Sequence, residues 1–136
     1  MEFKLRESEV VIKKLEKDWR IVLHGKKFEW SKAFLRFELL RDPILTNQRL
    51  VILENSEVEH EIPISSIELI ERVSSLIGMP YVRIKLLDGK TFSLAFVLPS
   101  LGAIYKKFFG FGPAIIIKGR KIVDEWTKAI KQARNL

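Results

Sequence analysis

The fold is decided by the stretch LTNQRLVIL at residues 45–53, which is followed after eight further residues by IPISSI at residues 62–67. The polar triplet Thr46-Asn47-Gln48 lies between the apolar runs Ile44-Leu45 and Leu50-Val51-Ile52. Asparagine tolerates a left-handed backbone, and its side chain can hydrogen-bond to its own main chain, so this triplet between two strand-like segments predicts a hairpin. The pattern describes architecture and contains no catalytic constellation.

Alternating apolar and polar residues predict further strands on either side of this hairpin. The clearest alternation runs through residues 81–97. A three-residue loop Leu87-Asp88-Gly89, with a left-handed Gly89, sets Ile84 opposite Phe92 and keeps the apolar residues on one face, whereas a two-residue turn mixes the faces. Proline cannot donate to a strand ladder, so Pro43 and Pro63 are expected at an edge or a bulge. Other strands are predicted at residues 20–23, 27–30, 35–39, 49–53, 59–64 and 67–73.

Residues 120–136 are predicted to form an amphipathic helix that covers one open end of a barrel. Apolar residues recur there at a spacing of three to four, with Trp126 as the expected plug. Asp124 and Glu125 are expected near the start of the helix and Arg134 near its end, which suits the helix dipole. Residues 10–23 combine helical and alternating spacings, so periodicity alone does not decide between helix and strand before Arg20.

The order of these motifs resembles the GRAM-type branch of the pleckstrin-homology-like superfold. The matching features are a strand, the LTN-RL hairpin, the IP-(any two)-I segment, the Asp88-Gly89-Lys90 hairpin and a terminal helix. The resemblance covers residues 34–133. It implies a mainly β fold, in which a bent antiparallel barrel of about seven strands is capped by a C-terminal α-helix. We therefore expect a single domain over residues 1–136, with an N-terminal extension (1–33), the barrel and its helix (34–97 and 120–136) and a hydrophobic insertion (98–119).

Composition and charge narrow the classes of function. The 136 residues suffice for one hydrophobic core, and the absence of cysteine excludes disulfides and thiolate metal sites and fits a cytoplasmic protein. The charged first ten residues do not resemble a secretory signal. The net charge of +7 is uneven: residues 54–71 carry six acidic and no Lys or Arg residues, while residues 72–136 carry twelve basic and three acidic ones. This asymmetry favours attraction to a polyanion or an anionic membrane surface, although an ordinary solvated surface explains it equally well.

Catalytic and metal chemistry finds little support. His24 and His60 are the only histidines, and neither has the spacing of a metal site, so no metal or cofactor is expected. No serine lies in a Gly-x-Ser-x-Gly setting, the glycines at 110–112 lack the strand-to-helix context of a dinucleotide site, and no carboxylates are paired as acid and base. We therefore expect a protein that is not an enzyme.

The hydrophobic insertion at residues 98–119 supplies the predicted binding residues. Pro99, Pro113 and a Lys pair interrupt it too often for a membrane span. Its aromatic and basic side chains suit an interfacial or partner-binding element. The alternative is that the insertion packs on its own barrel and that residues 115–117 form another strand. The predicted contact residues are Tyr105, Lys106, Lys107, Phe108, Phe109 and Phe111.

These observations predict a non-catalytic binding module that docks a protein partner, a second copy of itself or an anionic membrane surface, and that is cytoplasmic or peripheral to the membrane. In the family that the sequence resembles, phosphoinositide recognition depends on several basic residues near the first hairpin. Only Arg41 and Arg49 lie near that hairpin here, so specific head-group binding is not expected. The alternative is a basic nucleic-acid-binding barrel, but Arg83 and Lys85 have only Tyr81 as an aromatic neighbour, which is a weak signal.

Overall fold

The computed structural model describes residues 2–24, 40–74, 80–98 and 113–135. These residues form eight strands, a short 3-10 turn and one long α-helix, which confirms the mainly β fold with a C-terminal helix packed on the sheet. The elements are β1 (Val11–Lys14), β2 (Arg20–His24), β3 (Leu40–Thr46), β4 (Arg49–Glu54), β5 (Glu57–Pro63), η2 (Ile64–Ser66), β6 (Ile67–Val73), β7 (Tyr81–Leu86), β8 (Thr91–Val97) and α3 (Pro113–Arg134).

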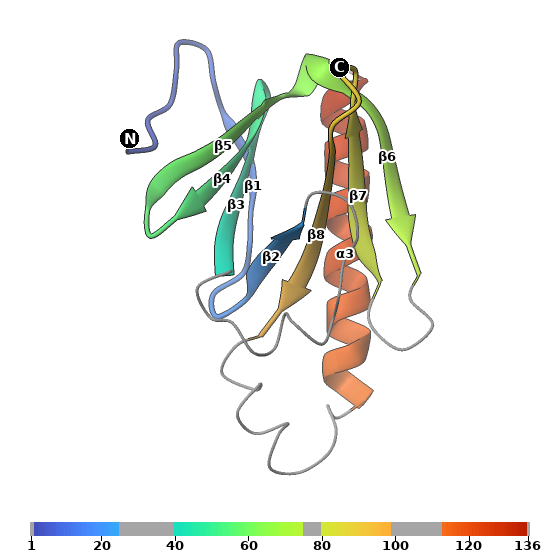
Figure 1. Ribbon diagram of the computed structural model, residues 1–136. Coiled ribbons are helices and arrows are strands. Elements are labelled where there is room, and N and C mark those ends of the chain that lie inside the picture. The colour runs from blue at the N-terminus through green and yellow to red at the C-terminus, as the bar shows by residue number, and fades with distance from the viewer. Residues whose placement is uncertain (1, 25–39, 75–79, 99–112, 136) are drawn as a thin grey trace.

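The strands form one bent antiparallel sheet in the order β5-β4-β3-β2-β8-β7-β6, and β1 pairs with β3 beside this path. Figure 1 shows the two halves of the sheet, which β2 joins by pairing with both β3 and β8. The segment before residue 34 therefore supplies a central strand. About seven strands were predicted, and β1 was not among them. The strands predicted at residues 27–30 and 35–39 lie outside the described residues. The predicted closure of the barrel is wrong for the described residues, because β5 and β6 end the strand order as unpaired edges.

The hairpin registers confirm the sequence-based predictions. β3 and β4 are joined by Asn47 and Gln48. In the β7–β8 hairpin Ile84 lies opposite Phe92 as predicted, and Gly89 has a φ of 90°. Asn55 and Ser56, both with positive φ, form the turn between β4 and β5.

The prolines differ in position. Pro63 ends the edge strand β5, as predicted. Pro43 lies inside the sheet instead, between the residues of β3 that pair with β2 and those that pair with β1. On this side of β3, neither β1 nor β2 pairs with Pro43, so the missing N–H of the proline costs no hydrogen bond of the sheet.

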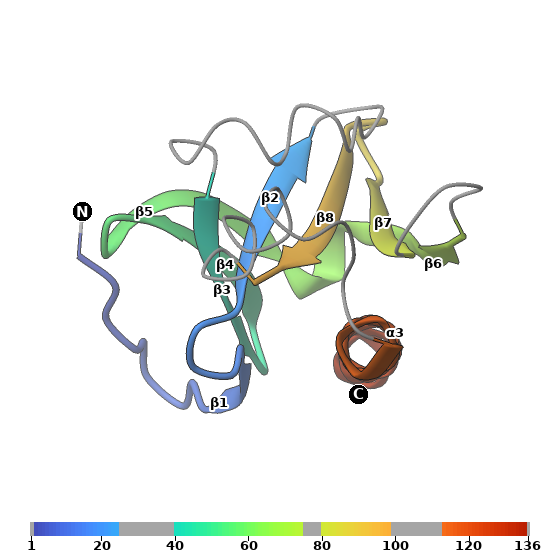
Figure 2. The ribbon, with the colours of Figure 1, turned by 90° about the horizontal axis from the view of Figure 1, so that it is seen from below.

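The main core lies between the sheet and α3. Figure 2 shows the helix end-on, lying against one side of the bent sheet. Ile122, Trp126, Ile130 and Ala133 are buried, and the Trp126 ring lies 5.8 Å from that of Phe96. This confirms the apolar face of the helix and the placement of Trp126. A second buried cluster, which includes Val22, Ala95 and Val97, lies on the opposite face, because alternate residues of a strand point to opposite sides.

The helix starts earlier than predicted. It begins at Pro113, so the alternative of a strand at residues 115–117 is wrong, and Asp124 and Glu125 lie in the middle of the helix and not near its start. A short apolar run does not distinguish a buried strand from a helix, whereas proline is favoured in a first helical turn. The basic last turn is confirmed, and Arg134 Nε there donates a hydrogen bond to the carbonyl oxygen of Ile67 at 2.6 Å. In the described part of the chain, no helix has both the length and the apolar character needed to cross a membrane.

Candidate functional site

The predicted binding residues lie outside the described residues, so the structure neither brings them together nor separates them. They are Tyr105, Lys106, Lys107, Phe108, Phe109 and Phe111. The described surface has four distinct features: the first hairpin, the outer face of β6–β8, the exposed side of α3 and the open seam beside β5.

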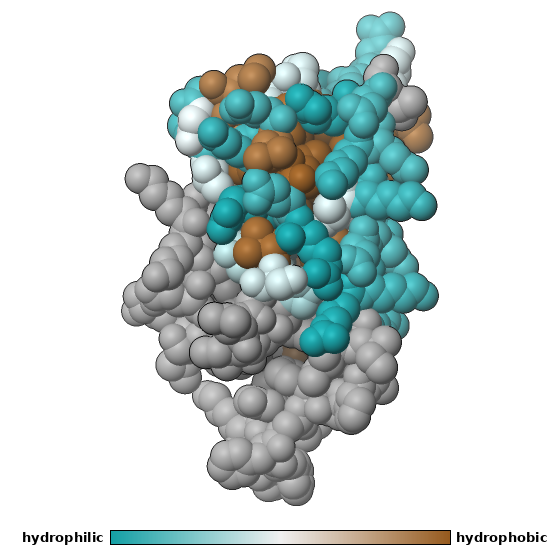
Figure 3. Space-filling model, turned by 90° about the vertical axis from the view of Figure 1, so that its right-hand side faces the viewer, coloured by the Kyte–Doolittle hydropathy of each residue, from teal (hydrophilic) through white to brown (hydrophobic). Residues whose placement is uncertain are grey.

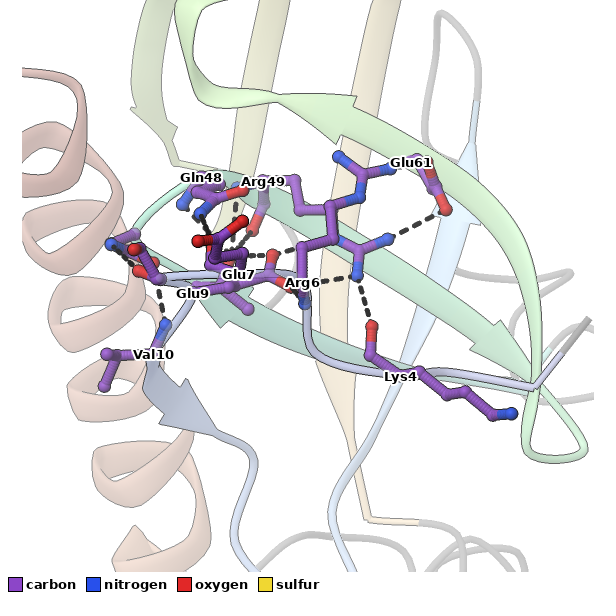
Figure 4. Close-up of polar contacts among 11 residues, drawn as sticks. Lys4, Arg6, Glu7, Glu9, Val10, Gln48, Arg49 and Glu61 are labelled. Atoms are coloured by element: carbon purple, nitrogen blue, oxygen red, sulfur yellow. Dashed lines mark hydrogen bonds and ion pairs between the residues drawn. The ribbon is translucent and has the colours of Figure 1, made fainter.

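The first hairpin holds a buried ion pair and no free cationic site. Arg49 is only 4% exposed. Its Nε and Nη2 atoms donate to the two carboxylate oxygens of Glu9 at 2.8 and 3.0 Å, and Nη1 donates to Glu61 at 2.8 Å. The carbonyl oxygen of Lys4 accepts a further bond from Nη2 (Figure 4). Arg49 is therefore fully occupied by its own chain.

Glu9 is the acidic partner that the sequence did not indicate. Its side chain is fully buried, and it also accepts a hydrogen bond from the Thr46 hydroxyl at 2.7 Å. Hydrogen bonding from Arg49 is the main cause that lowers the pKa of Glu9 to about 2, against the opposing effect of burial. Glu9 stands among several exposed charged residues in the sequence, and no local pattern distinguishes it.

The remaining polar residues of the hairpin hold the N-terminal segment, residues 2–10. The Asn47 side chain accepts a bond from the N–H of Val10 at 2.8 Å and donates one to the carbonyl of Ser8 at 3.1 Å. Gln48 donates to the carbonyl of Glu7 at 3.0 Å (Figure 4). The φ of Asn47 is not positive, and its side chain holds a segment that is distant in the sequence.

Arg41, the second basic residue near this hairpin, is also engaged. Its Nε donates to Glu59 at 2.9 Å, and Glu54 lies 3.6 Å from its Nη2 atom. These carboxylates raise the pKa of Arg41, while the same contact lowers the pKa of Glu59. Both arginines near the first hairpin are therefore held by carboxylates of their own chain.

The outer face of β6–β8 carries a shallow hollow of about 410 Å³ between Leu69, Glu71, Arg83, Lys85 and Thr91. Its two cations lie near carboxylates, with Arg83 3.8 Å from Glu71 and Lys85 4.0 Å from Glu68. Cross-strand pairs of this kind are ordinary features of a sheet surface. Figure 3 views the molecule from the β6 side and shows apolar patches interrupted by hydrophilic residues.

The exposed side of α3 carries a cluster of four cations. We call Arg120, Lys121, Lys128 and Lys131 the basic face of α3; all four are exposed, and their spacing places them on one side of the helix. Asp124 is the single carboxylate among them, and it is paired with Arg72. Lys121 lies 3.9 Å from Glu125, whereas Arg120, Lys128 and Lys131 have no ion-pair partner within the described residues.

The fourth place is a groove at the open seam of the sheet, with a volume of about 360 Å³. It runs between the edge strand β5 and the β7–β8 hairpin. Phe92 and Leu87 contribute apolar surface, and the His60 ring meets Phe92 edge-on at a centroid distance of 5.5 Å. His60 is half-exposed there. We call this feature the seam groove; the residues that line it are His60, Glu61, Ile62, Pro63, Ser66, Leu86, Leu87, Asp88, Lys90 and Phe92.

None of these places is a metal centre in the described part of the chain, because no three side chains of the His, Cys, Asp or Glu type are grouped to hold an ion there. The surface therefore offers a basic helix face and an apolar groove at a sheet edge. No protein-family model and no curated protein sequence matches this chain.

Proposed function

We propose that the protein is a non-catalytic binding module of the GRAM-like, pleckstrin-homology-like type, and that it docks on an anionic membrane surface. The observation that supports this proposal is the basic face of α3. Three of its four cations have no partner among the described residues, and its one carboxylate is paired with Arg72. The basic residues at the first hairpin are held by internal carboxylates, so the helix is the better candidate surface.

The charge of this face sets the expected strength of binding. A Lys or Arg close to an anionic lipid surface contributes about 1 kcal/mol, and salt screens this attraction. Four such residues provide weak, salt-sensitive binding. The predicted contact residues between Tyr105 and Phe111 precede α3 in the chain, and in this proposal they add apolar contact with the bilayer interface.

The test is co-sedimentation with vesicles of phosphatidylcholine alone and with added phosphatidylserine. We expect binding only to the anionic vesicles, falling steeply as salt rises. A variant in which the three unpaired cations of α3 become glutamine, Arg120→Gln, Lys128→Gln and Lys131→Gln, should lose most of this binding. The matched control removes three exposed cations from elsewhere on the surface, with Lys4→Gln, Lys85→Gln and Lys90→Gln, and should retain it.

The alternatives give different outcomes in the same assay. Equal loss in both triple variants would mean that only net charge matters and would contradict a docking face on α3. Binding that does not depend on salt would leave docking to a protein partner or to a second copy. Duplex DNA serves as the competitor: we expect weak, salt-sensitive binding to it, and tight sequence-specific binding to an oligonucleotide would favour the nucleic-acid-binding alternative.

A further inference from the structure

The seam groove lies beside an unpaired strand edge. β5 is the last strand of the sheet on this side, and among the described residues no strand pairs with it opposite β4. An unpaired edge presents backbone donors and acceptors that can bind another extended chain. The apolar surface of Leu87 and Phe92 lies directly across the groove, and Leu87 is 67% exposed.

The register shows which backbone groups of β5 point away from β4. Ile62 lies opposite Leu50, and the N–H of Ile64 donates to the carbonyl of Gln48 at 3.0 Å. Residues of an antiparallel strand alternate between facing the partner and facing away, so Ile62 and Ile64 face β4. The N–H and carbonyl of Glu61 therefore face the open side, and so does the carbonyl of Pro63, which accepts a hydrogen bond from the Ser66 hydroxyl at 2.7 Å. Because proline has no backbone N–H, Pro63 leaves no unpaired donor at this edge.

The chain itself shows that this edge accepts an extended segment. Glu2 forms an antiparallel bridge with Glu57 at the start of β5. The N-terminal segment then passes Arg49, whose Nη2 donates to the carbonyl of Lys4. Arg6 donates to the side-chain carboxylate of Glu61 at 2.8 Å and not to its backbone. Among the described residues, the second half of β5 has no strand partner on the side away from β4, and this half lines the seam groove.

We propose that the seam groove binds an extended peptide segment of a partner protein, which adds to the sheet as a strand beside β5. The residue opposite Glu61 exchanges two backbone hydrogen bonds with it. The two neighbouring residues of the peptide point to the other face, the face of His60 and Ile62, and place apolar side chains against Leu87 and Phe92. The site therefore selects an alternating polar and apolar segment, and it is separate from the basic face of α3.

A capped peptide, acetyl-Lys-Val-Thr-Val-Lys-amide, serves as the probe. In the proposed register its threonine lies opposite Glu61 and its two valines enter the groove. Titration followed by amide chemical shifts should move the signals of Glu61, Ile62 and Leu87 and leave those of α3 in place. The same peptide with a methyl group on the threonine nitrogen cannot donate to the Glu61 carbonyl, and we expect its binding to be at least about tenfold weaker.

Matched leucine variants test the position of the groove. Leu87→Ser removes exposed apolar surface from the groove and should weaken binding of the unmethylated peptide by roughly fivefold to tenfold. Leu69→Ser removes a similar side chain, 45% exposed, from the outer face of β6 and should change nothing. Equal binding of the two peptides, equal effects of the two variants, or no shifts at Glu61 would overturn the proposal. Shifts at Glu61 that arise from raising the protein concentration alone would assign the edge to a second copy and overturn it too.

Discussion

The buried pair of Glu9 and Arg49 is expected to make a large, pH-dependent contribution to stability, and Glu9→Gln tests it. Both side chains are almost completely buried, and their shortest contact is 2.8 Å. Breaking a buried pair by removing one partner costs about 3–5 kcal/mol, because the other charge is left uncompensated. Glu61 and the Lys4 carbonyl still contact Arg49, so the lower end of this range is expected.

The lowered pKa of Glu9 gives a second value for the same interaction. A carboxyl whose pKa falls from 4.5 in the unfolded chain to about 2 in the folded protein stabilises the fold by about 3 kcal/mol at neutral pH. Because the folded pKa is the lower one, this contribution is present above about pH 5 and is lost as the pH falls toward 2. The two values agree, and against a total stability of roughly 5–15 kcal/mol the effect is easily measured.

Urea denaturation of the parent and of Glu9→Gln provides the assay. At pH 7 the variant should be less stable by about 3 kcal/mol, and at about pH 3 the difference should fall to less than half of that value. Glu7→Gln is the matched control, because Glu7 is an exposed glutamate of the same segment. Adding Arg49→Met should remove most of the cost of Glu9→Gln, since no buried charge then remains. A loss below about 1 kcal/mol at pH 7, or the same loss at both pH values, would refute the reasoning.

Three further changes test the fold and the predicted contact residues. Trp126→Ala should lower stability by about 3–5 kcal/mol and lower the melting temperature accordingly, since Trp126 is 1% exposed. Gln132→Ala, on the exposed side of the same helix, should have little effect. Similar melting of both variants would contradict the assignment of Trp126 to the core. Gly89→Ala should lower the free energy of unfolding by about 1–2 kcal/mol in chemical denaturation. Open space surrounds Gly89, so the cost comes only from its φ of 90°, which strains a residue with a side chain. Unchanged stability would show that the backbone relaxes without strain. Replacing both Phe108 and Phe109 by serine should shift an oligomer toward monomer or abolish vesicle association, while the variant remains folded. If the variant unfolds and shows no specific change in sedimentation or vesicle binding, these residues belong to the core.

Local patterns in the sequence were sufficient for the parts of the fold that depend on local geometry. Alternation on both sides of Asp88-Gly89 predicted the register of β7 and β8, because a slip of one residue would expose the apolar face. The three-to-four spacing around Trp126 predicted which side of α3 is buried. The start of the helix was not predictable in this way, because residues 115–117 are three consecutive isoleucines, and such a run has no periodicity that distinguishes a helix from a strand.

Only the tertiary structure decided the features that join distant segments. Glu9 and Arg49 lie 40 residues apart in the chain, and nothing near either residue indicates that they meet. The same holds for β1, whose pairing with β3 settles a segment that periodicity left open between helix and strand, and for the open seam between β5 and the β7–β8 hairpin. Periodicity records which face of an element is apolar. Partners, edges and buried ion pairs depend on how the elements are arranged in space, and that arrangement is settled by the packing of the whole chain.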